Sequence, residues 1–321
     1  YIDSEINIDG KDDESQWKKA PKTPDFIDIA NNKKPLQKTY MKMLWDDENL
    51  YIYARLYEEH IWGDITKRDA VIFKNNDFEV FLKPSIIHTN YGELEINALG
   101  TVWDLLLNKP YRLGGKANTK WNIDNLKSDV YISGTINDPS DEDYYWSTEI
   151  SIPLNEILEI NGPDYKKVKS GDIWRANFSR VQWEHDISNG KYSRKKENNK
   201  LKREYNWVWS RQGQINMHIP ENWGFIYFND KNEINTDFDL KIDIKTEQYG
   251  YALFEKIKYR ELKYLNDKAI DERIQLNSKS LKNNNISAEF IKTKDGFLIK
   301  CKNQIDDFIY TINQEGIIKY E

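Results

Sequence analysis

Alternating apolar and polar residues dominate the first two thirds of the chain. Between residues 38 and 57 the segment TYMKMLW alternates, and LYIYARL follows after a polar turn. The second segment places four apolar residues on one face: Leu50, Ile52, Ala54 and Leu56. Tyr51 and Tyr53 occupy the other face. A period of two is typical of β-strands, and two covered faces favour a sandwich of sheets.

The same alternation returns in further segments that short polar turns separate. It predicts strands at residues 5–8, 77–82, 93–97, 103–107, 130–136, 146–152 and 174–183, and a short helix at 154–160. The stretch from His185 to Tyr205 is predicted to be a long polar loop. Strands that recur at regular spacing with polar turns are the signature of an antiparallel β-sandwich.

Composition changes near residue 230. All 11 Trp lie at or before Trp223, and all 9 Pro lie at or before Pro220. We therefore predict two domains, residues 1–230 and 231–321, with the boundary in the polar stretch 229–237. In the second domain the pattern predicts a helix over 248–264 and strands at 288–293, 297–302, 308–313 and 317–320. Asp295-Gly296 is a hairpin signal. The fold class is an all-β antiparallel β-sandwich with a smaller C-terminal α+β extension.

Bulk composition excludes several classes of protein. Hydrophobic residues make up 39% and charged residues 31% of the chain, as in ordinary globular proteins. No apolar run approaches the roughly 20 residues that span a bilayer, so we expect no membrane span. The net charge of −6 argues against a nucleic-acid partner. The single cysteine, Cys301, allows no disulfide within the chain.

The N-terminal stretch offers a core residue and a cluster of carboxylates. Trp17 is expected in the core. The acidic residues Asp12, Asp13 and Glu14 precede it, and they can cap a short helix or bind Ca²⁺; capping is the favoured interpretation. The chain begins at Tyr1 without an apolar leader, which a removed signal peptide or a shortened chain would each explain.

Residues 172–228 interleave aromatic rings with amide, guanidinium and imidazole groups. Aromatic faces cover the C–H faces of a sugar, and fixed polar groups pair with its hydroxyls, so this region favours a carbohydrate ligand. The candidate ligand-binding residues are Phe73, Glu79, Glu95, Asn97, Trp103, Arg175, Asn177, Arg180, Trp183, Trp209, Gln212, Asn216 and His218.

Each candidate also has a structural interpretation. Glu79 can belong to a carboxylate network, and His218 can anchor its own loop. Trp207 and Trp209 share a face, but alternation does not decide whether that face is outside. The tryptophans expected in the core are Trp45, Trp146, Trp174 and Trp223.

A glycan-cleaving enzyme is the main alternative to a non-catalytic binding protein. Asp77, Glu79, Glu95 and Asp104 are expected to meet across neighbouring strands, and a hydrolase or lyase needs such a carboxylate pair. The catalytic candidates are Glu79, Glu95, Asp104 and His218. No GxSxG, HExxH or phosphate-loop motif is present. A protein-interaction or assembly module is the third possibility.

Several segments resemble a known family in their order along residues 5–228. They are Ile8-Asp9-Gly10 with Trp17, LWDDENLYI at 44–52, DFEVFL at 77–82, EIN at 95–97 with Gly100, Trp146 with EISIP at 149–153, GDIWRAN at 171–177, and His218 through Gly224. This order resembles the family 9 carbohydrate-binding modules, and more closely the family-9-like proteins of bacterial polysaccharide-use systems.

The resemblance implies a sandwich that binds sugars, often at a chain end, with bound calcium. The candidate calcium ligands are Asp12, Asp13, Asp46 and Asp47. It also implies a secreted, periplasmic or cell-surface location and association with other glycan-handling proteins. Two tryptophans clamp the sugar in typical members. Phe73 and Met217 stand near those places here, so the clamp is altered. Residues 229–321 are not part of the typical module.

Overall fold

The chain folds into two compact units. The computed structural model describes residues 1–321 except 32, 86–87, 231–242, 277–284, 306 and 321. The first unit comprises Tyr1–Pro84, Asn90–Asn108 and Lys116–Ile234, and the second comprises Ser85–Thr89, Lys109–Gly115 and Asn235–Glu321. Most of the predicted boundary, 229–237, lies outside the described residues. The composition gave no sign that two short internal segments join the second unit.

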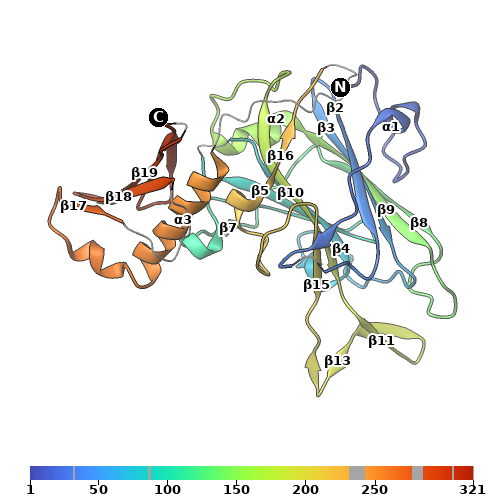
Figure 1. Ribbon diagram of the computed structural model, residues 1–321. Coiled ribbons are helices and arrows are strands. Elements are labelled where there is room, and N and C mark those ends of the chain that lie inside the picture. The colour runs from blue at the N-terminus through green and yellow to red at the C-terminus, as the bar shows by residue number, and fades with distance from the viewer. Residues whose placement is uncertain (32, 86–87, 231–242, 277–284, 306, 321) are drawn as a thin grey trace. The chain divides into compact units, whose positions relative to one another are not determined.

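The smaller sheet of the first unit has four antiparallel strands in the order β2-β3-β9-β8. They are β2 (Thr39–Trp45), β3 (Asn49–Tyr57), β9 (Tyr145–Pro153) and β8 (Lys127–Ser133). The long strands β3 and β9 pair along their whole length, from Asn49 opposite Pro153 to Tyr57 opposite Tyr145 (Figure 1). The strand predicted at 130–136 begins three residues earlier than expected.

The larger sheet follows the order β1-β15-β10-β4-β5-β6-β7, and β16 also pairs with β10. Its strands are β1 (Ile27–Asp28), β15 (Tyr205–Val208), β10 (Ile173–Gln182), β4 (Asp77–Lys83), β5 (Tyr91–Asn97), β6 (Val102–Leu107), β7 (Ala117–Asn118) and β16 (Gly224–Tyr227). All of these pairs are antiparallel. Short helical segments lie between strands: α1 (Ser15–Lys19), η1 (Ile72–Lys74), α2 (Leu154–Leu158), η3 (Glu159–Asn161) and η4 (Pro220–Asn222).

One face of each sheet meets the other in a common apolar core. Phe78 and Val80 of β4 lie in the same buried cluster as Ile52 of β3 and Trp146 of β9. The predicted β-sandwich is therefore confirmed. Since side chains alternate along a strand, the residues of opposite parity lie on the other side of the larger sheet. We call that side the outer face; its polar members include Asp77, Glu79, Glu93, Glu95, Asn97, Arg175, Asn177 and Ser179.

The N-terminal stretch differs in part from expectation. Trp17 is fully buried as predicted, and its Nε1 donates to Glu149 at 2.7 Å. The N-cap of α1 is Glu14, whose side chain makes no capping hydrogen bond. The predicted short helix therefore does begin directly after the acidic trio, but Glu14 does not cap it by a side-chain hydrogen bond. Residues 5–8 do not form the predicted strand, because no neighbouring strand supplies ladder hydrogen bonds to them.

The stretch from His185 to Tyr205 is two hairpins rather than a loop. Strand β11 (His185–Ser188) pairs with β12 (Lys191–Arg194), and β13 (Lys196–Glu197) pairs with β14 (Lys200–Leu201); both hairpins project from the sandwich (Figure 1). Asn189-Gly190 and Asn198-Asn199 have positive φ at both turn positions, as tight hairpin turns require. The Asn-Gly dipeptide was the missed signal.

The second unit packs a helix on a five-stranded sheet. Helix α3 (Ile244–Tyr259) begins four residues before the predicted start, because Asp243 caps it by accepting from Lys245 N and Thr246 N. The sheet order is β17-β18-β19-β20-β21, with bounds β17 (Arg273–Gln275), β18 (Ile286–Thr293), β19 (Gly296–Asn303), β20 (Ile309–Asn313) and β21 (Ile318–Tyr320). Segments η2 (Tyr111–Leu113) and η5 (Lys263–Asp267) complete the unit.

The second unit has its own core. Phe254 of α3 is buried in one cluster with Phe290 and Ile299 of the sheet. The predicted α+β extension is therefore confirmed, although strand β17 was missed. Among the described residues, no helix has the length and hydropathy to cross a membrane.

Candidate functional site

A row of side chains crosses the outer face of the larger sheet. Ser179 of β10 pairs with Glu79 of β4, Glu79 pairs with Glu95 of β5, and Glu95 pairs with Trp103 of β6. Directly paired residues on one face have Cβ atoms about 5 Å apart. The antiparallel register therefore brings two carboxyl groups and an indole together from three neighbouring strands.

Asp77 and Glu93 enlarge this row into a group of four carboxyls, which we call the acidic cluster: Asp77, Glu79, Glu93 and Glu95. Asp77, Glu79 and Glu95 each place one oxygen within 4.8 Å of the others. Asp77 Oδ1 accepts from Val181 N at 3.3 Å, and Glu95 Oε2 accepts from Phe73 N at 2.9 Å.

Three oxygens of the acidic cluster are buried without a hydrogen-bond partner. They are Asp77 Oδ2, Glu79 Oε2 and Glu93 Oε2. Buried polar atoms in proteins are nearly always paired, so these three oxygens call for an explanation. Glu79 and Glu93 keep 5% and 6% of their surface exposed, so the cluster is not entirely closed to solvent.

Ionisation of the acidic cluster is unfavourable, because its carboxyls are buried and close to one another. Burial raises the pKa of Glu79 to about 7; the nearby Ser179 hydroxyl opposes this rise, and the Glu204 carboxylate adds to it. Burial also raises the pKa of Asp77, Glu93 and Glu95 well above the ordinary range, and the neighbouring carboxyls push each of these pKa values further up. None of the four makes an ion pair with a described Lys, Arg or His.

Aromatic side chains border the acidic cluster. Phe73 in η1 is 40% exposed, and its carbonyl accepts from Trp183 Nε1 at 2.8 Å. Trp103 is half-buried, and its Nε1 has no hydrogen-bond partner. Trp183 is buried, with the Arg194 guanidinium 4.8 Å from its ring centre. Of the predicted aromatic contacts, Phe73 is the one with an exposed ring.

Three predicted ligand residues hold the 209–223 segment against the outer face instead. Arg175 donates to Pro220 O at 2.7 Å, and Asn177 bonds the backbone of Ser210 through both its Nδ2 and its Oδ1. Gln212 Nε2 donates to Ser210 O and Asn222 O. These polar groups satisfy backbone atoms in a segment that contains no strand and whose helical part is the short η4, which is a structural role.

His218 and Asn216 serve the same segment. His218 Nδ1 lies 2.8 Å from the Tyr91 hydroxyl, and burial lowers the pKa of His218 to about 4. Asn216 Oδ1 accepts from His218 N at 2.9 Å. Met217 is buried, and its carbonyl accepts from Trp223 Nε1 at 2.7 Å. The anchoring interpretation of His218 fits this arrangement, and Met217 keeps only 7% of its surface exposed.

Asn97 shapes the turn between β5 and β6. Its Nδ2 donates to Ile65 O at 2.8 Å and to Asn75 Oδ1 at 3.2 Å, while its Oδ1 accepts from Leu99 N and Thr101 N. The amide is fully used by these four bonds, so it has nothing left to offer a ligand.

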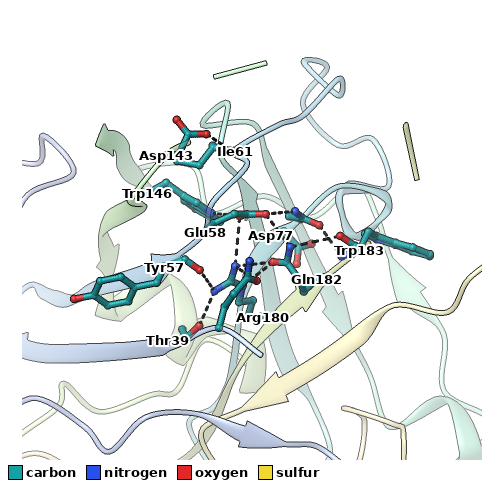
Figure 2. A network of polar contacts seen from close by, with 12 residues as sticks. Thr39, Tyr57, Glu58, Ile61, Asp77, Asp143, Trp146, Arg180, Gln182 and Trp183 are labelled. Atoms are coloured by element: carbon teal, nitrogen blue, oxygen red, sulfur yellow. Dashed lines mark hydrogen bonds and ion pairs between the residues drawn. The ribbon is translucent and has the colours of Figure 1, made fainter. Parts of the chain in front are cut away.

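The Arg180 side chain lies on the core side of the larger sheet, whereas Glu79 lies on the outer face. Figure 2 shows its guanidinium directed at Glu58 and Gln182, with an ion pair to Glu58 Oε2 at 3.4 Å and a hydrogen bond to Gln182 Oε1 at 2.6 Å. It also donates to Tyr57 O at 2.9 Å. Alternation along β10 puts Arg180 on the same side as Phe178, which removes it from the outer face.

Trp209 also lies on the core side. Its ring packs against the sandwich core and meets Phe178 edge to face, with ring centres 5.6 Å apart. A Cβ on Gly224 would come within 2.4 Å of this ring, so the glycine is required by the close packing of the indole. Trp207 is buried in the same cluster. The tryptophans expected in the core, Trp45, Trp146, Trp174 and Trp223, are all buried.

Asp104 does not meet Glu79 and Glu95 as expected. It pairs with Leu94, a core residue, while its neighbour Trp103 pairs with Glu95. Because neighbouring residues of a strand point to opposite faces, Asp104 lies on the other side of the sheet from Trp103. There it accepts from Arg68 at 2.8 Å and from Ile123 N at 2.7 Å. The four catalytic candidates, Glu79, Glu95, Asp104 and His218, are thus not assembled around one point.

Two of the four candidate calcium ligands, Asp12 and Asp46, already have their oxygens engaged. Asp12 forms ion pairs with Lys42 and Arg55, both at 2.8 Å. Asp46 accepts from the backbone of Glu48 and Asn49 and from the Tyr51 hydroxyl. A carboxylate that is already neutralised or fully hydrogen-bonded has little left for a cation. Asp13 and Asp47, which are less buried, complete this set. Calcium binding itself stays a prediction.

Sequence reasoning left Asp77 and Glu93 out of the ligand set. The alternation in DFEVF and ELEIN placed both on the same faces as Glu79 and Glu95. Their burial, and the absence of a compensating cation among the described residues, depend on neighbours that are distant in the chain, which the alternation does not reveal.

Comparisons with known proteins place the chain near carbohydrate-binding structures at low similarity. No family model matches the chain, and no curated protein matches it. Solved structures similar to it include a candidate carbohydrate-binding protein from Bacteroides uniformis, with a TM-score of 0.49 and 13% identity over 67% of this chain and 88% of that one.

Two others are complexes of a family 9 carbohydrate-binding module from Caldicellulosiruptor kristjanssonii. The cellotriose complex has a TM-score of 0.45 and 13% identity over 74% of this chain and 96% of that one. The glucose complex has a TM-score of 0.45 and 14% identity over 72% and 96%. The sequence motifs resemble the same family. Similarity this remote transfers neither a ligand nor site residues to this chain.

Proposed function

We propose that this protein binds carbohydrate on the outer face of its larger sheet, beside the acidic cluster. One observation carries the proposal: the exposed ring of Phe73 and the half-buried indole of Trp103 border the carboxyl oxygens of Glu95, because Phe73 N donates to Glu95 Oε2 and Trp103 pairs with Glu95 across the sheet. Sugar hydroxyls donate to such oxygens, and sugar C–H groups pack on such rings.

The site differs from the one that the sequence predicted. The proposed site keeps Phe73, Glu79, Glu95 and Trp103 of the predicted residues and adds Glu93. The order of family-9-like motifs over residues 5–228 supports the same class of ligand. Poly- or oligosaccharide recognition without catalysis is the form we propose, together with a secreted, periplasmic or cell-surface location and association with other glycan-handling proteins.

A panel of poly- and oligosaccharides, screened on an array and then measured by calorimetry, tests the proposal. At least one should bind, and Phe73→Ala should weaken that binding tenfold or more. Tyr144→Ala is the matched control, because Tyr144 is also an exposed aromatic of the same unit, at 62% exposure. The proposal is overturned if no saccharide binds at millimolar concentration, or if the two variants behave alike.

A further inference from the structure

The acidic cluster has a property that sugar binding does not explain. Its three closest carboxyls, Asp77, Glu79 and Glu95, present only acceptor oxygens to one another. Carboxyls that crowd together in a buried place must either hold protons or share a cation, because their mutual repulsion is not screened by water.

The spacing of these oxygens suits one metal ion. Oxygen ligands of Ca²⁺ lie about 2.3–2.6 Å from the ion, and those of Mg²⁺ about 2.0–2.1 Å, so two oxygens around one ion are at most about 5 Å apart. The oxygens offered by Asp77, Glu79 and Glu95 all lie within 4.8 Å of one another.

Two observations beyond the clustering point to a bound ion. Asp77 is fully buried and Glu79 is 5% exposed, yet Asp77 Oδ2 and Glu79 Oε2 have no hydrogen-bond partner. In addition, Glu93 Oε2 beside them is equally unpaired, and no Lys, Arg or His of the described residues forms an ion pair with any of the four carboxyls.

The other acidic group in the described residues provides a contrast. Asp9, Glu14 and Glu149 are also close together. Glu149, however, accepts from Trp17 Nε1, Asp9 N and Gly10 N, which occupies both of its oxygens. That carboxylate holds the N-terminal segment in place, and its oxygens are not free for a cation.

We propose that Asp77, Glu79 and Glu95 bind one divalent cation on the outer face of the larger sheet. All-carboxylate oxygen ligands select hard ions, so Ca²⁺, Mg²⁺ or Mn²⁺ is the class of ligand. Glu93 lies on the same strand two residues from Glu95 and supplies further negative charge. The proposal does not depend on carbohydrate binding, because a cation can hold β4 and β5 together whether or not a sugar binds beside it.

Metal titration of the whole chain tests this site without any sugar. Protein stripped with EDTA and dialysed is titrated with CaCl₂, MgCl₂ and MnCl₂ separately by calorimetry, and its thermal unfolding is followed with and without each ion. One equivalent of at least one ion should bind. At one hundred times its Kd that ion should raise Tm by roughly 5 °C.

Variants locate the site. Glu79→Gln and Glu95→Gln should each weaken binding tenfold or more, while Glu142→Gln, an exposed acid of the same unit, should leave it unchanged. In EDTA at pH 8, Glu79→Gln should have a higher Tm than the parent protein, since it removes one repelling charge. In saturating cation the order should reverse. A purely structural role for Glu79 would not reverse it.

Two outcomes overturn the proposal. One is the absence of both binding heat and a Tm shift with all three ions at millimolar concentration. The other is binding that the Glu79 and Glu95 variants leave intact, which would assign the ion to another place. If the protein binds a saccharide but no cation, this inference alone is refuted. If it binds a cation but no saccharide, only the proposed function is refuted.

Discussion

Glu79 on β4 and Glu95 on β5 are directly paired across the larger sheet, and both are buried carboxyls without an ion-pair partner in the described part of the chain. Like charges placed directly opposite each other destabilise a sheet. The pair therefore costs stability unless a proton, a cation or a ligand hydroxyl compensates it. The repulsion between Glu79 and Glu95 therefore bears on the stability of the fold and on both proposals.

Stability in EDTA should fall as pH rises from about 4.5 to about 7. Burial raises the pKa of Glu79 from 4.5 to about 7, so the folded state holds a proton there that the unfolded state releases. The stabilisation is complete below pH 4.5 and is lost as pH passes 7; for Glu79 alone it is on the order of 3 kcal/mol. Asp77, Glu93 and Glu95 act in the same direction.

Urea unfolding at several pH values in EDTA measures this effect. Glu79→Gln should flatten the slope, because glutamine does not titrate. Saturating divalent cation should also reduce the loss above pH 7. A slope that is identical in the parent protein and in Glu79→Gln would contradict the assignment to this cluster.

His218 should produce the opposite trend with pH. Burial lowers the pKa of His218 from 6.5 to about 4, so the folded state holds its imidazole neutral. The resulting stabilisation is present above pH 6.5 and is lost as pH falls towards 4. The free-energy difference between the parent protein and His218→Gln should therefore shrink across this window. NMR titration of the imidazole should give a pKa near 4, and a value near 6.5 would refute the buried placement.

Arg180→Met should destabilise the first unit by about 3–5 kcal/mol, because it leaves Glu58 buried without its cation. Glu58 is buried, and its remaining side-chain partners, Gln182, Trp146 and Asn76, are neutral donors. Chemical unfolding measures the loss. The control is Lys167→Met, which removes the exposed pair with Glu48 and should cost less than about 1 kcal/mol. Equal effects of the two substitutions would contradict the network of Figure 2.

Trp209→Ala should lower stability and leave the carbohydrate affinity of the folded protein unchanged. The indole packs against Phe178 and Gly224 on the core side, so its removal opens a cavity. Trp209 is only partly buried, so the free energy of unfolding should fall by roughly 2–4 kcal/mol, somewhat less than for a fully buried aromatic residue. Calorimetry under conditions where the variant remains folded measures the affinity. A selective loss of affinity at unchanged stability would return Trp209 to the binding site.

The tight turns show how local signals were used and missed. Asp295-Gly296 correctly predicted the β18–β19 hairpin, in which Thr293 pairs with Gly296. Asn189-Gly190 carried the same kind of signal, yet the many charges around it favoured a loop. Local turn chemistry outweighed composition there, because positive φ at both positions fixes the chain reversal.

The sequence alone determined the sandwich, its main strands and the membership of each strand face. A period of two is a local property, so Phe78 and Val80 could be assigned to one face and Asp77 and Glu79 to the other before any contact was known. The change in composition near residue 230 likewise indicated an extension of a different class.

Only the tertiary structure decided which polar groups remain available to a ligand. Arg175, Asn177, Gln212 and His218 have the chemistry of sugar contacts. The backbone of the 209–223 segment takes hydrogen bonds of the first three, and the His218 ring is buried against the Tyr91 hydroxyl. One step of parity places Asp104 behind the sheet, and the pairing of β4 with β5 crowds Glu79 against Glu95. Hydrogen-bond saturation and charge compensation depend on neighbours that are distant in the chain, which periodicity does not encode.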